Sequence, residues 1–129
     1  MVLTAFEPRR SDARQFALVQ RVLLLRNANG VALDVALGGL PFEERTTERS
    51  SLWKATTAYR LRTCSAEDLI VHKAFRKSFL DWADIERILM RQGEKLDTDL
   101  IVRELTPLAE LKEEPEIVER LRGLIAKFV

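Results

Sequence analysis

The sequence predicts an α+β fold: a small antiparallel sheet of two or three strands, followed by a C-terminal bundle of about four helices. Two observations carry this prediction. Apolar runs lie on either side of Asn29-Gly30, a dipeptide typical of tight hairpins. From Ser65 onward, capping residues precede segments whose apolar side chains recur at helical spacing. The 129 residues suffice to bury a core, and we expect a single domain over residues 1–129.

The composition is that of an ordinary globular chain and excludes several classes of site. The formal net charge of +1 gives no global attraction to nucleic acid or membranes. Five arginines in the first quarter form either a local basic patch or a solvated face: Arg9, Arg10, Arg14, Arg21 and Arg26. Cys64 is the single cysteine, so no intrachain disulfide can form, and a reducing cytoplasmic setting is expected. One histidine and one cysteine cannot build a His/Cys zinc site, and no apolar run approaches the ~20 residues that cross a bilayer.

The strands are predicted in the first half of the chain. Residues 1–14 are polar and basic, which indicates a loose start. The apolar run over 18–26 favours a strand, although a helix is an alternative for so apolar a segment. Val31–Leu37 alternates cleanly between its two faces, with Asp34 between two alanines on the second face. Small neighbours leave room for a ligand beside this carboxylate, but they also suit packing against a helix.

The segment between this hairpin and Ser65 is predicted to be less regular. Gly38, Gly39 and Pro41 end the strand. The charged stretch 42–51 is expected to form a loop with room for one helical turn. Ala55–Arg62 favours a third strand, because Thr57, Tyr59 and Leu61 alternate with smaller or charged residues.

Capping residues mark the start of each helix in the second half. Ser65 fits an N-cap, and Asp68 is expected to return the capping bond. Ser78 and Asp81 repeat this pattern for a second helix, which Gly93 ends. Asp97 is expected to cap a third helix.

Two prolines organise the end of the chain. Pro107 is expected to interrupt the third helix, because a proline inside a helix removes a backbone hydrogen bond. Pro115 suits the first position of a last helix with a clear apolar stripe.

Lys73 lies on the apolar face of the first of these helices, beside Leu69 and Ile70. Such a lysine extends to solvent, pairs with a carboxylate or binds an anion. Asp81 and Asp84, three residues apart on the next helix, are the candidate partners, although acidic residues in a first turn also favour the helix dipole.

The residues around Lys73 resemble a known family. Residues 65–75 read S-A-E-D-L-I-V-H-K-A-F, and D-W-A-D-I follows eight residues after the lysine. This pattern resembles the C-terminal part of nucleotidyltransferase-like proteins of the DNA polymerase beta-type superfamily. The bacterial branch in question includes abortive-infection and toxin–antitoxin toxins. Relatives carry an arginine five residues after the lysine, where this chain has Ser78, and Arg76 is the nearest substitute.

The resemblance implies transfer of a nucleoside monophosphate from a nucleoside triphosphate to a hydroxyl of RNA or protein, with magnesium. It assigns catalysis to Asp34, Lys73 and Asp81, nucleotide binding to Lys73, Arg76 and Asp84, and metal binding to Asp34, in Leu33-Asp34-Val35. Trp82 is interpreted as a core residue, with base stacking as the alternative.

The chain departs from the family pattern before Asp34. The family has an Asp-x-Asp there, whereas the only Asp-x-Asp of this chain is Asp97-Thr98-Asp99. We therefore expect a chain that corresponds to the C-terminal part of the family fold. The alternative is a catalytically inactive relative that serves as an interaction subunit. In the complete family fold, the N-terminal half packs on this apolar sheet. Because this chain lacks that half, we expect either a homodimer or binding to a separate chain that supplies it.

Overall fold

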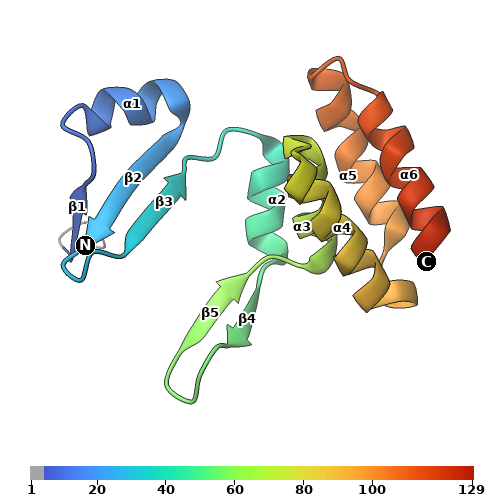
Figure 1. The fold of residues 1–129 in the computed structure, drawn as a ribbon, viewed down its shortest axis with the longest axis horizontal. Coiled ribbons are helices and arrows are strands. Elements are labelled where there is room, and N and C mark those ends of the chain that lie inside the picture. Colours follow the sequence, from blue (N-terminus) through green and yellow to red (C-terminus); the bar gives the residue numbers. More distant parts are fainter. Residues whose placement is uncertain (1–4) are drawn as a thin grey trace. The chain divides into compact units, whose positions relative to one another are not determined.

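The computed structural model describes residues 5–129 and confirms the α+β class with C-terminal helices. The described residues form six α-helices and two small antiparallel sheets of three and two strands (Figure 1). The chain divides into two compact units, which meet in sequence between Glu44 and Arg45, and each is described by itself. The loose start was expected over residues 1–14, of which residues 1–4 lie outside the described part. The rest is more regular than expected, because residues 6–8 form a strand and a helix begins at Ala13.

The first unit contains a three-stranded sheet with the order β1-β2-β3. Its strands are β1 (Phe6–Pro8), β2 (Val22–Asn27) and β3 (Ala32–Ala36), all antiparallel. The predicted hairpin is confirmed. Its loop is a turn in which Gly30 N–H donates to Asn27 O at 3.0 Å, and Gly30 has the positive φ of +80° that glycine adopts readily. Asn29 does not share this conformation; the Asn27 side chain instead accepts the N–H groups of Asn29 and Val31.

The predicted start of the first strand is wrong. Residues 18–20 belong to helix α1 (Ala13–Gln20), which packs on β2 through the buried Ala17. Arg21 ends the helix in the left-handed conformation (φ +57°) and donates its N–H to Ala17 O. Glycine or asparagine is usual at such a position, so the boundary has no residue signal in the sequence. In this sheet Leu25 is buried, whereas Leu33 on β3 is 37% exposed, so association through the sheet stays a prediction.

The segment that was expected to be a loop forms helix α2 (Pro41–Arg49). The Glu43 carboxylate accepts the N–H groups of Gly39 at 2.6 Å and Leu40 at 2.9 Å, which satisfies donors at the start of the helix. The prediction failed because α2 has no apolar stripe. Its buried side chains are Phe42 and Thr46, and its last turn is held by charged contacts described below.

The second unit contains the four C-terminal helices and a separate hairpin. The hairpin pairs β4 (Ser51–Lys54) with β5 (Arg60–Thr63), so residues 55–62 do not form one continuous strand as predicted. The intervening residues make a loop in which Ala55 N–H donates to Tyr59 O, and the Thr56 hydroxyl accepts from Ala58 and Tyr59.

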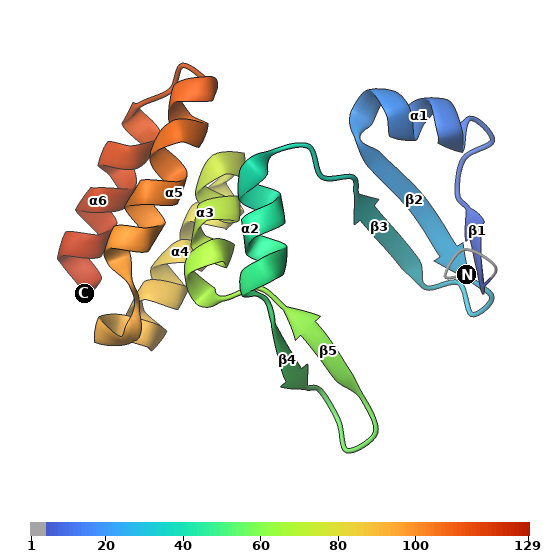
Figure 2. The ribbon, with the colours of Figure 1, turned by 180° about the vertical axis from the view of Figure 1, so that it is seen from behind.

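Four helices pack around one core, with α3 in contact with each of the other three. They are α3 (Ala66–Arg76), α4 (Phe79–Gln92), α5 (Thr98–Leu111) and α6 (Glu116–Phe128), with a 3-10 turn at Gly93–Lys95 (Figures 1 and 2). The core consists of aliphatic side chains that are almost wholly inaccessible: Ile70, Val71, Ala74, Ile85, Leu89, Ile101, Leu105 and Leu121.

The N-caps Ser65, Ser78 and Asp97 are confirmed, as is Gly93 at the end of α4. The predicted interruption at Pro107 is wrong, because α5 continues through it. Buried residues lie on both sides of this proline, Ile101 and Leu105 before it and Leu108 and Ala109 after it, and their packing outweighs one lost backbone bond. Pro115 precedes α6 by one residue and is its N-cap.

Candidate functional site

Asp34 lies on β3 with a side chain that is 64% exposed, and Arg9 forms an ion pair with it. Three residues align across the sheet to produce this pair. Arg9 N–H donates to Leu24 O at 3.0 Å, and Leu24 is the register partner of Asp34. The predicted metal ligand is therefore reachable from solvent but already neutralised by a guanidinium.

Lys73 meets both predicted carboxylates where α3 and α4 pack together. Its Nζ lies 2.7 Å from Asp84 Oδ2 and 3.6 Å from Asp81 Oδ1. The Lys73 side chain is 22% exposed, Asp81 6% and Asp84 40%. The expected contact is thus present, and the positive charge of Lys73 is paired with carboxylates of the same chain. The ammonium of Lys73 holds the pKa of the Asp84 carboxyl below its usual value.

Asp81 has a second set of partners in the first turn of α4. Ser78 Oγ donates to Asp81 Oδ2 at 2.6 Å, and Asp81 N–H donates back to Ser78 Oγ at 3.1 Å. The Ser78 hydrogen bond is the largest cause of a lowered pKa at Asp81. Arg76 Nε lies 3.7 Å from Asp81 Oδ2, so the arginine that is closest to the family position does reach this cluster.

Trp82, beside Asp81, is a core residue with a side chain that is 4% exposed. The guanidinium of Arg120 lies over its ring at 4.2 Å from the centroid. The interpretation of Trp82 as a core residue is confirmed, and the ring is not open to a nucleobase.

Replacing Lys73 with methionine tests how much this cluster stabilises the fold. The change leaves the buried Asp81 without its ammonium partner, and we expect the free energy of unfolding to fall by roughly 1–3 kcal/mol, less than for a fully buried pair because Asp84 is exposed to water. Denaturation in urea measures it. Arg87→Met is the matched control, since Arg87 forms its ion pair with the exposed Asp84 and is itself 74% exposed, and it should change stability by less than about 1 kcal/mol. Equal stability of Lys73→Met and wild type would show that the lysine is free for a ligand.

A network of two partly exposed arginines and two buried carboxylates was not foreseen from the sequence. Arg49 donates to Asp68 through Nε at 3.1 Å and Nη2 at 2.5 Å, and to Glu104 through Nη1 at 2.9 Å. Arg45 adds a bidentate contact to Glu104, with Nη2 at 2.6 Å. The side chains of Asp68 and Glu104 are 1% and 7% exposed.

This network corrects the role predicted for Asp68. Ser65 caps α3 by accepting the Asp68 N–H at 3.1 Å, but the Asp68 carboxylate binds Arg49 rather than returning the capping bond. The available signal was the spacing of Arg45 and Arg49, which puts both on one face of a helix, yet that segment was expected to be a loop.

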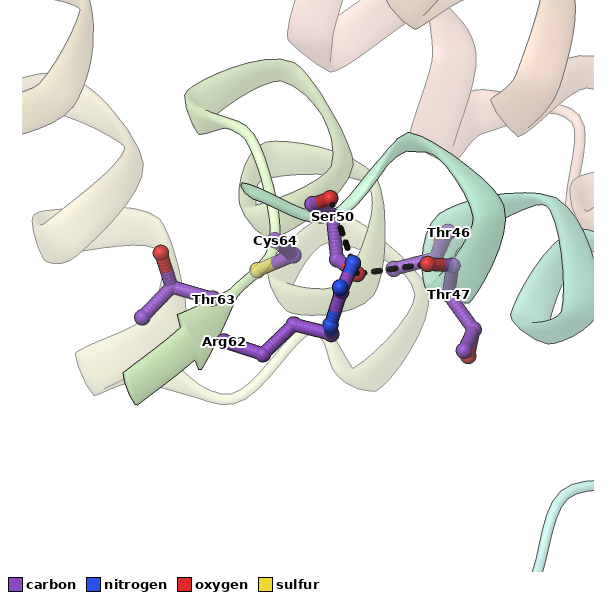
Figure 3. A pocket seen from close by; sticks show the side chains of 6 residues that line it. All are labelled: Thr46, Thr47, Ser50, Arg62, Thr63 and Cys64. Atoms are coloured by element: carbon purple, nitrogen blue, oxygen red, sulfur yellow. Dashed lines mark hydrogen bonds between the residues drawn. The ribbon is translucent and has the colours of Figure 1, made fainter. Parts of the chain in front are cut away.

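A pocket of about 280 Å³ lies where the β4–β5 hairpin joins the helices of the second unit (Figure 3). Arg62 donates through Nη1 to Ser50 O at 3.1 Å and to Ser50 Oγ at 3.2 Å. Burial raises the pKa of the Cys64 thiol, and the Asp68 carboxylate raises it further, so this thiol is a poor nucleophile. The lining is rich in hydroxyl groups and contains no carboxylate: Thr46, Thr47, Ser50, Arg62, Thr63 and Cys64.

The Thr46 hydroxyl is a buried polar group of this pocket that has no hydrogen-bond partner among the described residues. Thr46 is 8% exposed, and its Oγ1 makes no hydrogen bond within the described part of the chain. Buried hydroxyls are normally paired, so a hydroxyl without a partner in a pocket wall can accept or donate to a ligand.

Residues 5–129 contain no group of three His, Cys, Asp or Glu side chains that could hold a metal ion. Over the same residues, no helix is long and apolar enough to cross a membrane. Comparison of the chain with family models, curated proteins and solved structures finds no match. The nucleotidyltransferase assignment therefore remains a hypothesis that rests on the motif between Ser65 and Ile85.

Proposed function

We propose that this chain is a nucleotidyltransferase-like protein that is catalytically inactive on its own and serves as an interaction subunit. The observation that carries the proposal is the contact of Lys73 with Asp84 and Asp81, because these are the residues of the motif that resembles the family. A lysine whose charge is neutralised at 2.7 Å attracts a triphosphate less than a free one does. Asp34 is likewise neutralised by Arg9.

A second candidate is nucleotidyl transfer by an assembly in which another segment or chain supplies an Asp-x-Asp. It is favoured by the exposure of Asp34, whose carboxylate can be reached by a second component. An acceptor hydroxyl of RNA or protein would attack the α-phosphorus of a nucleoside triphosphate, and pyrophosphate would leave. Lys73 and Arg76 would lie toward the phosphates, with Asp84 orienting Lys73. The described residues do not complete a magnesium site, because Asp34 belongs to no cluster of three ligands, and we derive no step through the metal.

Incorporation of labelled nucleotide tests both candidates. The purified chain, given labelled nucleoside triphosphates, magnesium and RNA or protein acceptors, is expected to transfer no label, because the sequence has no Asp-x-Asp before Asp34. Asp34→Ala is the diagnostic variant. Asp99→Ala is the control, since Asp99 is an exposed aspartate in the first turn of α5. Magnesium-dependent transfer that disappears in Asp34→Ala and persists in Asp99→Ala would contradict the non-catalytic proposal.

A further inference from the structure

The two strands of the β4–β5 hairpin are exposed to solvent. All eight residues of its two strands are exposed, and both views show it extending away from helices α3–α6 of the same unit (Figures 1 and 2). Isolated two-stranded hairpins are marginally stable in water. This hairpin exposes a large surface and contributes little to the hydrophobic core. Such a surface is expected to have a partner.

The register of the hairpin separates its side chains into two faces. Trp53 pairs with Leu61, and the bond from Ala55 N–H to Tyr59 O continues the ladder, so Trp53, Leu61 and Tyr59 share one face. Their exposed fractions are 57%, 53% and 70%. Two aromatic rings and an aliphatic side chain are therefore open to solvent on a single face.

The opposite face is basic. Lys54 pairs with Arg60, and Leu52 pairs with Arg62, which puts three cations together on this face. No aspartate or glutamate occurs from Ser50 to Ala66. The hairpin thus has a formal charge of +3 in a chain whose net charge is only +1. Its local field attracts a polyanion although the whole chain does not.

Exposed aromatic rings on one face of a two-stranded ribbon, cations on its opposite face and the absence of acidic residues match the chemistry of single-stranded nucleic acid. Unpaired bases stack on aromatic side chains, and phosphates contact lysine and arginine. A duplex offers no free base faces to Trp53 and Tyr59, so a single strand is favoured. The basic face leads through Arg62 into the hydroxyl-lined pocket, whose Thr46, Thr47, Ser50 and Thr63 can exchange hydrogen bonds with ribose 2′-hydroxyls (Figure 3).

We propose that the β4–β5 hairpin binds single-stranded RNA, with bases on the Trp53–Tyr59 face and phosphates along Lys54, Arg60 and Arg62. The binding needs neither a metal nor a nucleoside triphosphate. It therefore stands or fails independently of nucleotidyl transfer.

Fluorescence anisotropy of a fluorescein-labelled 12-nucleotide oligouridine tests the proposal on the full chain. Affinity should fall as salt rises, because phosphate contacts release counterions. Trp53→Ala should weaken binding about 10-fold, the loss of one base–aromatic stack. The triple variant Lys54→Gln/Arg60→Gln/Arg62→Gln should reduce the slope of log affinity against log salt by about two, corresponding to three phosphates on a single strand.

Matched controls alter the same residue types elsewhere in the second unit. Phe79→Ala removes an aromatic side chain that is 85% exposed, and Arg91→Gln/Lys95→Gln/Arg103→Gln removes three exposed cations. Both should bind oligouridine as wild type does. Quenching of Trp53 emission is a second readout, because Trp82 is buried; Trp53→Phe should abolish the quenching while keeping part of the affinity.

Several results would overturn the assignment. Equal affinity of wild type and both hairpin variants for oligouridine would exclude the hairpin as the RNA-binding surface. Equal binding of oligouridine and oligothymidine would remove the role of the 2′-hydroxyl and with it the choice of RNA. Binding to phosphatidylserine vesicles without binding to oligouridine would show that the hairpin binds a membrane surface instead. A dimer that is seen by light scattering and that dissociates in Trp53→Ala would show that the hairpin binds a second copy of the chain.

Discussion

Arg49→Met is expected to lower the free energy of unfolding of the helical unit by about 3–5 kcal/mol. Arg49 is the shared partner of Asp68 and Glu104, whose side chains are 1% and 7% exposed. Its removal leaves Asp68 as a buried carboxylate without its arginine, and an uncompensated buried charge costs far more than the intact pair contributes. Denaturation in guanidinium chloride, followed by far-ultraviolet circular dichroism, measures the change.

Two further variants separate loss of the pair from loss of side-chain volume. Arg45→Met should lower the stability much less than Arg49→Met does, because Glu104 keeps its bond to Arg49 and Arg45 is 43% exposed. Arg49→Met combined with Asp68→Leu should recover much of the stability lost in the single variant, since removing both members of a buried pair leaves no orphaned charge. A single variant as stable as wild type would show that the network contributes nothing to the fold.

Acid is expected to destabilise the same unit. The Arg45 hydrogen bond is the main cause of a lowered pKa at Glu104, against an ordinary value of 4.5, and burial acts in the opposite direction. Asp81 has a pKa below its ordinary 3.8, mainly through Ser78. The unfolded chain binds protons at these groups at higher pH than the folded chain does. Their stabilising effect is therefore complete above pH 4.5 and is lost as pH falls through the folded pKa values.

Urea denaturation at a series of pH values between about 7 and 3 measures this loss. The unfolding midpoint should be nearly constant at the upper end and fall steeply below pH 4.5. Glu104→Gln should flatten the decline and lower the midpoint at neutral pH, because an amide cannot replace the charged contacts to Arg45 and Arg49. A midpoint that is independent of pH in wild type would contradict the assigned pKa directions.

The C-terminal helices could be predicted because their signals are local. Ser65, Ser78 and Asp97 each cap the backbone three residues ahead, and the apolar stripes repeat within a few turns. The contact between Lys73 and the two aspartates could also be predicted, since a lysine on an apolar face needs a partner and the next helix offers carboxylates. The functional assignment went beyond these signals and rests on a motif alone.

The incorrect predictions in the first half of the chain have a common cause, which is the lack of a local signal in the sequence. Arg21 ends α1 in a left-handed conformation that its residue type does not indicate. Helix α2 lacks an apolar stripe, and its last turn is held by Asp68 and Glu104, which lie 19 and 55 residues away from Arg49. The strand predicted over Ala55–Arg62 covers the loop between β4 and β5 and the first residues of β5, so the prediction missed the turn of the hairpin.

Local patterns were enough to predict the α+β class, the Asn-Gly hairpin, the four C-terminal helices and the partners of Lys73, because each depends on residues close together along the chain or on neighbouring helices. Three features became visible in the folded chain alone: Arg49 joins Asp68 to Glu104, Arg9 neutralises Asp34, and Trp53 and Tyr59 share one face of an exposed hairpin. The ion pairs join residues distant in sequence, and the free energy that selects them comes from burial and charge pairing in the folded chain. The shared face of Trp53 and Tyr59 follows from the register of the hairpin.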